Sequence, residues 1–180
     1  ETMGLRFRRD PLCVVQLSAG DGDAHVVKLS RPDYDAPNLK RLLTDPAVTK
    51  IFHFGRFDIA MFHLHLGVLT APFYCTTIAS KLARTYTDRH GLKDVAKELA
   101  GVDMSKAQQS SDWGAAELSQ AQLDYAASDV LYLHAIMNLL YEMLVREGRM
   151  ELALACFDFL PVRSRLDLAG WDEIDIFAHA

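Results

Sequence analysis

The feature that most constrains this chain is the stretch LSQAQLDYAASDVLYL at residues 118–133. Ser119 can accept hydrogen bonds from the free N–H groups of a first helical turn, and Gln122 completes a capping-box pattern. Apolar residues recur near the helical period, which predicts an amphipathic helix. Tyr125 and Asp129 are four residues apart and project from one side of it. This pair is either a metal-holding and water-orienting pair or a hydrogen-bonded surface pair.

Length and composition indicate an ordinary globular domain. The 180 residues are 50% apolar and 24% charged, enough to bury a sizeable core in one domain. No apolar run approaches the roughly 20 residues of a membrane span, so we expect no membrane partner. Cys13, Cys75 and Cys156 are widely spaced, as in a reduced cytoplasmic protein without disulfides or zinc. The net charge of −5 argues against a long duplex-DNA surface, whereas metal ions could neutralise a short nucleic acid.

Turn signals and apolar periodicity predict a strand-rich first half and a helical second half. The expected strands are 12–17, 25–29, 48–54 and 73–75, and the first two form a hairpin around the Gly-Asp turn at 20–23. The expected helices are 35–44, 55–66, 76–84, 91–100, 119–147 and 150–160, with 163–169 adding a turn or two. This order predicts an α/β fold, a mixed β-sheet flanked by α-helices.

Some segments carry expectations of their own. Strand 48–54 should be buried on both faces because its apolar run is nearly continuous. Gly148 should break the long helix, and Pro161 should end or kink the next one. Trp113 lies in a polar segment and should be exposed. The tail 171–180 carries apolar residues with no partner element in the sequence.

The acidic residues at the ends of these elements are candidate metal ligands. Asp58 falls in the first turn after a buried strand, where functional groups gather in open α/β sheets, although it could also only complement the helix dipole. With Glu1 and Asp129 it gives a set of carboxylates, which suit hard cations such as Mg²⁺. Two such ions about 3.5–4 Å apart can clamp a phosphoryl displacement. The histidines are scattered and are expected to be structural or solvated.

Several motifs occur in order along the chain. They are ETMGL at 1–5, HFGRFD at 53–58, DRHGLKDVAKEL from 88, QQSSDW at 108–113 and YAASD at 125–129. This set resembles the DEDDy family of 3′–5′ exonucleases, in its ribonuclease D branch. Nearly the whole chain, including the segment 159–180, is similar to the nano-RNase C group within that branch. The resemblance implies a ribonuclease H-like fold of the DnaQ/ribonuclease D type.

The resemblance also implies where the exonuclease domain begins and to which of two sister classes, DEDDy or DEDDh, it belongs. The family's first motif is Asp-x-Glu, in which Glu1 matches the Glu and the Asp would lie two residues earlier. Residues 1–180 are therefore expected to be one N-terminally truncated exonuclease domain, with a helical and tail extension from about residue 150. The DEDDh sister class has a His where Asp124 stands, whereas Tyr125 occupies the tyrosine position of the DEDDy class.

The implied catalytic residues are Glu1, Asp58, Tyr125 and Asp129. The three carboxylates would hold two divalent cations, Mg²⁺ or Mn²⁺, and Tyr125 would orient the attacking water, releasing nucleoside 5′-monophosphates. Leu5 would fit as a wedge between the last two bases, or would pack in the core. The other implied substrate-binding residues are Met3, His53 and Phe57 around base and sugar, and Lys106 and Gln109 at the 5′-phosphate.

The implied function is a metal-dependent 3′–5′ exoribonuclease acting on short single-stranded RNA, down to dinucleotides, with DNA left open. Its implied assembly is a closed homo-oligomer, an octamer, which Ile174, Ile176 and Phe177 would help to join. Two other classes stay open: a catalytically dead nucleic-acid-binding module and a structural assembly subunit. The presence of Glu1, Asp58, Tyr125 and Asp129 together argues against both.

Overall fold

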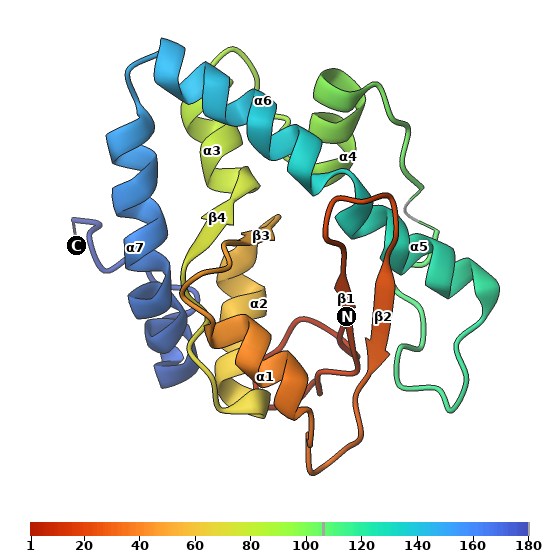
Figure 1. Cartoon of the computed structure of the whole chain (residues 1–180). Coiled ribbons are helices and arrows are strands. Elements are labelled where there is room, and N and C mark those ends of the chain that lie inside the picture. Colours follow the sequence, from red (N-terminus) through yellow and green to blue (C-terminus); the bar gives the residue numbers. More distant parts are fainter. Residues whose placement is uncertain (106, 180) are drawn as a thin grey trace.

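The computed structural model describes residues 1–105 and 107–179 and has an α/β architecture (Figure 1). The strands are β1 (Val14–Leu17), β2 (His25–Lys28), β3 (Lys50–Phe52) and β4 (Phe73–Cys75). The α-helices are α1 (Pro37–Thr44), α2 (Gly55–Met61), α3 (Thr76–Ala83), α4 (Leu92–Val95), α5 (Gln120–Leu131), α6 (Leu133–Arg146) and α7 (Met150–Leu166). The π-helical turns η1 (Phe62–Leu66), η2 (Ala96–Ala100) and η3 (Asp167–Trp171) follow α2, α4 and α7.

The predicted hairpin is confirmed. β1 and β2 pair antiparallel from Val14 opposite Lys28 to Leu17 opposite His25. Ahead of β1, Thr2 forms an antiparallel bridge with Leu12. The N–H of Cys13 donates to the carbonyl of Glu1 at 2.9 Å. The first residues therefore lie alongside the hairpin.

β3 and β4 pair in parallel, with Lys50 opposite Phe73 and Phe52 opposite Cys75. β3 is shorter than the predicted strand 48–54. Only Lys50 in it is buried, and its Nζ donates to the carbonyls of Asp45 at 2.8 Å and Ala71 at 2.6 Å. Burial on both faces was therefore a wrong expectation for the rest of β3, which borders a groove described below. In the described residues the two strand pairs form separate sheets flanked by helices.

The long helix predicted from Ser119 to Glu147 is two helices. The capping box is confirmed, because the Ser119 hydroxyl accepts from the Gln122 N–H and the Gln122 side chain accepts from the Ser119 N–H. The chain then breaks at Tyr132, whose φ is −101° and ψ −4°. α6 restarts at the next residue and packs across α3.

The C-terminal part is more continuous than predicted. α7 runs through Pro161 to Leu166 and packs against α2, α3 and α6. The tail turns back onto α7, where the rings of Phe159 and Phe177 lie 5.8 Å apart, so it has a partner element that the sequence did not reveal. Within the described part of the chain, none of the helices combines the length and apolar character needed to cross a membrane.

Candidate active site

The predicted site residues line one groove of about 1320 Å³. Its walls are the N-terminal segment, the hairpin, β3, the start of α2 and the inner side of α5. The residues brought together are Glu1, Met3, Leu5, His53, Phe57, Asp58, Gln109, Tyr125 and Asp129. Lys106, the other candidate, lies outside the described residues. Segments far apart in the sequence therefore converge on one concave surface.

Glu1 reaches the groove because its segment is held against β1. The carbonyl of Glu1 accepts hydrogen bonds from the N–H groups of Cys13 and Val14, at 2.9 and 3.2 Å. The Gln16 amide on β1 donates to Glu1 Oε1 at 3.1 Å. Both the backbone and the carboxylate are thus fixed to the hairpin.

Asp58 lies in the first turn of α2 directly after β3, as predicted. Phe54 makes this abrupt connection in the left-handed region, with φ 63°. The next residue must be small, because a Cβ at Gly55 would lie 2.9 Å from the Phe52 Cβ. Tight strand-to-helix turns of this kind project the first-turn side chains at a strand end.

Tyr125 and Asp129 are presented from one side of α5, as their spacing predicted. The Tyr125 ring packs against Trp113, with centroids 5.9 Å apart. Trp113 is only 1% exposed, so the expectation of an exposed tryptophan was wrong. Gln122, in the capping box, also donates to the Asp112 carbonyl at 3.0 Å, which ties this loop to α5. Trp113 is therefore a buried ring that packs against Tyr125 and helps to fix its position.

Burial and, after it, the mutual repulsion of carboxylates determine the electrostatics of the groove. Burial, together with the charge of Glu1, raises the pKa of Asp58. Burial, the Glu1 charge and a hydrogen bond with Glu1 raise the pKa of Asp129 to about 7. Burial and the charges of Asp129 and Glu1 raise the pKa of Tyr125, so its phenol stays protonated at neutral pH.

The carboxylates of Glu1, Asp58 and Asp129 suit divalent cations chemically, but they do not enclose an ion by themselves. Clustered carboxylates at neutral pH need positive countercharge, and oxygen ligands suit Mg²⁺ or Mn²⁺. Within residues 1–105 and 107–179, however, no three His, Cys, Asp or Glu side chains form a ready-made cage for a single ion. Mg²⁺ is commonly held by one or two carboxylates, with water and substrate phosphate completing its shell. The donor set is suited to that open kind of site.

The predicted substrate-binding residues lie on the groove with different degrees of exposure. Leu5 is 78% exposed, which excludes core packing and leaves it available to a ligand, and Met3 is 46% exposed. Phe57 stacks on Phe7 at 5.4 Å. His53 Nδ1 lies 2.8 Å from the Thr76 hydroxyl, and burial lowers its pKa to about 4, so it is neutral at pH 7.

The sequence did not single out other residues that line the groove. Phe54 is 54% exposed beside Asp58, and Lys81 and His90 line the same wall. His90 Nδ1 is 2.9 Å from the Ser80 hydroxyl. Phe54 could have been found from the sequence, because it is an aromatic residue directly before the Gly-Arg-Phe-Asp run at 55–58. No sequence pattern marks Lys81 as a groove residue, because its segment has the pattern of an ordinary amphipathic helix.

Comparisons with known proteins agree on the kind of enzyme this site belongs to. Residues 1–145 match a family model described as 3′–5′ exonuclease. Ribonuclease D of Granulibacter bethesdensis is 40% identical over 139 residues, 77% of this chain and 35% of that protein. The chain thus spans about a third of the length of the curated relatives it matches.

Solved structures cover more of the chain. Brucella melitensis NrnC with bound Mg²⁺ is 58% identical, with a TM-score of 0.95, and the match covers 100% of this chain and 88% of that one. Brucella melitensis NrnC bound to pGG is 59% identical, with a TM-score of 0.96, covering 100% and 87%. The fold predicted from the motifs is therefore confirmed.

Asp129→Asn should raise the melting temperature of the metal-free protein at pH 8. The pKa of Asp129 is about 7 in the fold, against 3.8 for an unperturbed aspartate. The folded state therefore binds this proton more tightly than the unfolded state, and ionisation costs stability as the pH rises from about 4 to about 7. The gain in melting temperature should be full above about pH 7 and absent below about pH 4. For a chain of this size, each kcal/mol of stability corresponds to about 2–4 °C in melting temperature. Thermal unfolding in EDTA across this range measures it.

Asp124→Asn is the matched control, because it neutralises an exposed carboxylate on the same helix. It should leave the melting temperature nearly unchanged at every pH. A gain from Asp129→Asn that grew toward acid pH would contradict the repulsion described here.

Proposed function

The chain belongs to the DEDDy-type 3′–5′ exonucleases of the ribonuclease D-like superfamily, alongside NrnC, and from this premise we propose that it hydrolyses short single-stranded RNA from the 3′ end, down to dinucleotides. The observation that carries the proposal is the convergence of Glu1, Asp58, Tyr125 and Asp129 in one groove. The products are nucleoside 5′-monophosphates. The free thiols of Cys13, Cys75 and Cys156 suit a reducing compartment, so we place this activity in the cytoplasm.

In this proposal Glu1, Asp58 and Asp129 hold two divalent cations, Mg²⁺ or Mn²⁺. When bound, such ions lower the pKa of a coordinated water and offset charge on the phosphate. The carboxylates themselves gain from the countercharge, because burial and their mutual repulsion oppose full ionisation without it. NrnC of Brucella melitensis has been solved with bound Mg²⁺, which supports this choice of ion.

Tyr125 positions the attacking water in this proposal. Its phenol is held from behind by Trp113 and stays protonated at neutral pH, because its pKa is raised. It therefore acts as a hydrogen-bonding group at a fixed position, and it does not act as a phenolate base. Asp129, one helical turn away, lies on the same side of α5. The helix thus sets the spacing between water-orienting and metal-holding groups.

Tyr125→Phe should slow hydrolysis by roughly 10²–10⁴-fold while substrate binding survives, since only the hydroxyl is removed. The assay follows nucleoside 5′-monophosphate release from a 5′-phosphorylated RNA dinucleotide in Mg²⁺ or Mn²⁺, with an EDTA blank. Tyr141→Phe, an exposed hydroxyl on α6, is the matched control and should keep full activity.

The same assay separates the competing functions. No release by the unmodified protein in either metal would leave the nucleic-acid-binding module or the structural subunit as the better proposal. Equal losses of affinity and rate in Tyr125→Phe would make Tyr125 a packing residue.

The groove favours short substrates. Exposed Leu5 and Met3, with Phe57 in the same groove, can hold the last bases, and neutral His53 and Gln109 add polar contacts. We propose that Gln109, which lines the groove, contacts the 5′-phosphate together with Lys106, which lies outside the described residues. The net charge of −5 offers little to a long phosphate backbone. Brucella melitensis NrnC bound to pGG supports a short ligand.

A two-nucleotide RNA with a free 3′-hydroxyl should therefore bind at least as tightly as longer strands. Few phosphates are contacted, so few counterions are released and the affinity should depend only weakly on salt. Titrating 5′-phosphorylated RNAs of two, four and seven nucleotides into Asp58→Asn protein, at several salt concentrations, measures both quantities. Affinity that climbs with length, with a steepening salt dependence, would show an extended binding surface instead. Matched DNA strands test whether the 2′-hydroxyl matters.

The tail supports a proposal about assembly. Although it folds back on α7, Ile174, Ile176 and Phe177 remain 51%, 42% and 75% exposed. Large apolar side chains grouped on a surface mark contacts with other chains. We propose that they pack against a second copy in a closed homo-oligomer, an octamer.

The double variant Ile174→Glu with Ile176→Glu should lower the mass in solution, because it places two charges in the proposed interface. Light scattering measures the mass. His179→Glu, an exposed change in the same tail, is the control and should leave it unaltered. An unaltered mass in the double variant would show that the tail serves its own chain only.

A further inference from the structure

Arg56 connects the first turn of α2 to the C-terminal part of the chain. It lies two residues before Asp58, and two residues are about 200° apart around an α-helix, so the two side chains leave on opposite sides. Asp58 faces the groove, whereas Arg56 faces α7 and the tail. Its guanidinium binds Asp167 through two hydrogen bonds, Nε to Oδ2 at 2.6 Å and Nη2 to Oδ1 at 2.7 Å. This fork-to-fork geometry fixes both partners in orientation as well as distance.

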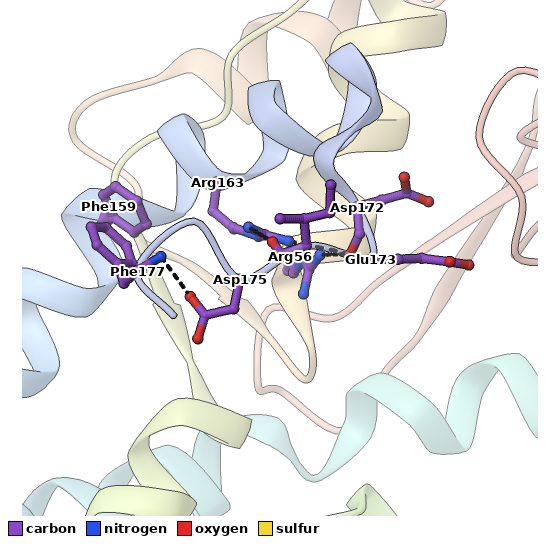
Figure 2. Close-up of a pocket in the computed structure, with 8 residues that line it drawn as sticks. Arg56, Phe159, Arg163, Asp172, Glu173, Asp175 and Phe177 are labelled. Atoms are coloured by element: carbon purple, nitrogen blue, oxygen red, sulfur yellow. Dashed lines mark hydrogen bonds between the residues drawn. The ribbon is translucent and has the colours of Figure 1, made fainter. Parts of the chain in front are cut away.

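Further contacts from the same region hold Arg56. The hydroxyl of Ser164 on α7 donates to the Arg56 carbonyl at 3.0 Å. Arg56 Nη2 donates to the Asp172 carbonyl at 2.7 Å, as Figure 2 shows. The main chain and side chain of one residue in the catalytic turn are therefore both bound to the C-terminal segment.

Asp167 is the centre of this arrangement. Its side chain is 0% exposed, and it also pairs with Arg163 Nε at 3.2 Å. Arg163 in turn donates to the carbonyls of Trp171 and Ile174, both at 2.9 Å. Arg163 and Arg56 both line a cavity of about 410 Å³ (Figure 2). Replacing a buried ion pair by apolar packing is often neutral for stability, so stabilisation alone does not account for this arrangement. The two guanidiniums paired with Asp167 fix the relative orientation of the elements that it joins.

We propose that Asp167 is a positioning residue for catalysis, which holds the first turn of α2 through Arg56 so that Asp58 stays at the metal-binding position; this rests on the function proposed above. The N-cap residue of α2 is the left-handed Phe54, whose side chain cannot cap the first turn and whose own N–H donates to the Thr77 hydroxyl at 2.8 Å. Its first turn therefore depends on contacts from outside the helix. On the side away from the groove, the paired hydrogen bonds of Arg56 to Asp167 supply such a contact.

Asp167→Asn tests this inference, because it removes the charge and one acceptor while keeping the size. Glu173→Gln is the matched control: it removes the same charge from an exposed side chain that lines the same cavity. We expect Asp167→Asn to weaken Mn²⁺ binding, measured by electron paramagnetic resonance titration, by about tenfold. The kcat for a dinucleotide should fall by up to about 10²-fold, the usual effect of a small displacement of a reacting group. Glu173→Gln should change neither.

A merely structural role would lower the melting temperature without moving the Mn²⁺ dissociation constant or the kcat of the folded fraction. That result would overturn the inference, as would a loss of activity that follows a loss of oligomer mass in light scattering. If Asp167→Asn does not fold, Arg56→Lys gives the same test, since it keeps the positive charge and removes the paired hydrogen bonds to Asp167. Unchanged Mn²⁺ affinity in Arg56→Lys would then count against the inference. An inactive but metal-binding unmodified protein would instead mean that the proposed function is wrong.

Discussion

Mutual repulsion among Glu1, Asp58 and Asp129 is the constraint on which the rest of the structure depends. Burial and proximity raise the pKa values of Asp58 and Asp129, so the ionised set is unfavourable until positive charge is supplied. A site of this kind cannot form by the attraction of its own members. It has to be imposed by a scaffold whose favourable contacts lie elsewhere.

Each carboxylate has a separate support behind it. Glu1 is held by backbone hydrogen bonds to β1 and by the Gln16 amide. The helix that carries Asp129 is fixed at its start by the capping box and, through Tyr125, by buried Trp113. Asp58 depends on the tight turn at Gly55 and, in our proposal, on Asp167. The groove therefore joins parts of the molecule that are stabilised independently, with Leu5 and Met3, the proposed substrate contacts, exposed between them.

The sequence predicted most of what is encoded locally. Glycine-rich turns gave the hairpin, and Ser119 with Gln122 gave the start of α5, because these signals act within a few residues. The break at Tyr132 was missed since no Gly or Pro marks it; packing of α6 across α3 sets its direction. Trp113 was misjudged because its neighbours in sequence are polar, whereas its neighbours in space are Cys13, Val14 and Ala126.

In the candidate site too, the residues within local motifs were predictable, whereas the contacts between distant segments were not. The motifs marked Asp58, Tyr125 and Asp129 and predicted that they would meet, and they line one groove. The supports were not predictable, because each is a contact between distant segments. Arg56 and Asp167, 111 residues apart, carry no local signal that would pair them. Pro161 misled for a related reason: α7 is held by its packing on α2 and α3 and so continues where a local rule would stop it.

The long sequence separation of these contacts also sets when activity can arise during folding. Glu1 meets Asp129 only after the hairpin and α5 have docked, and Arg56 meets Asp167 only after α7 has formed near the C-terminal end. Contacts of such high sequence separation are closed late, because the entropy of a long loop has to be overcome first. A chain emerging from the ribosome can therefore build its hairpin early, before the acidic residues of the groove have met. On the function proposed above, hydrolysis would begin only once the fold is complete.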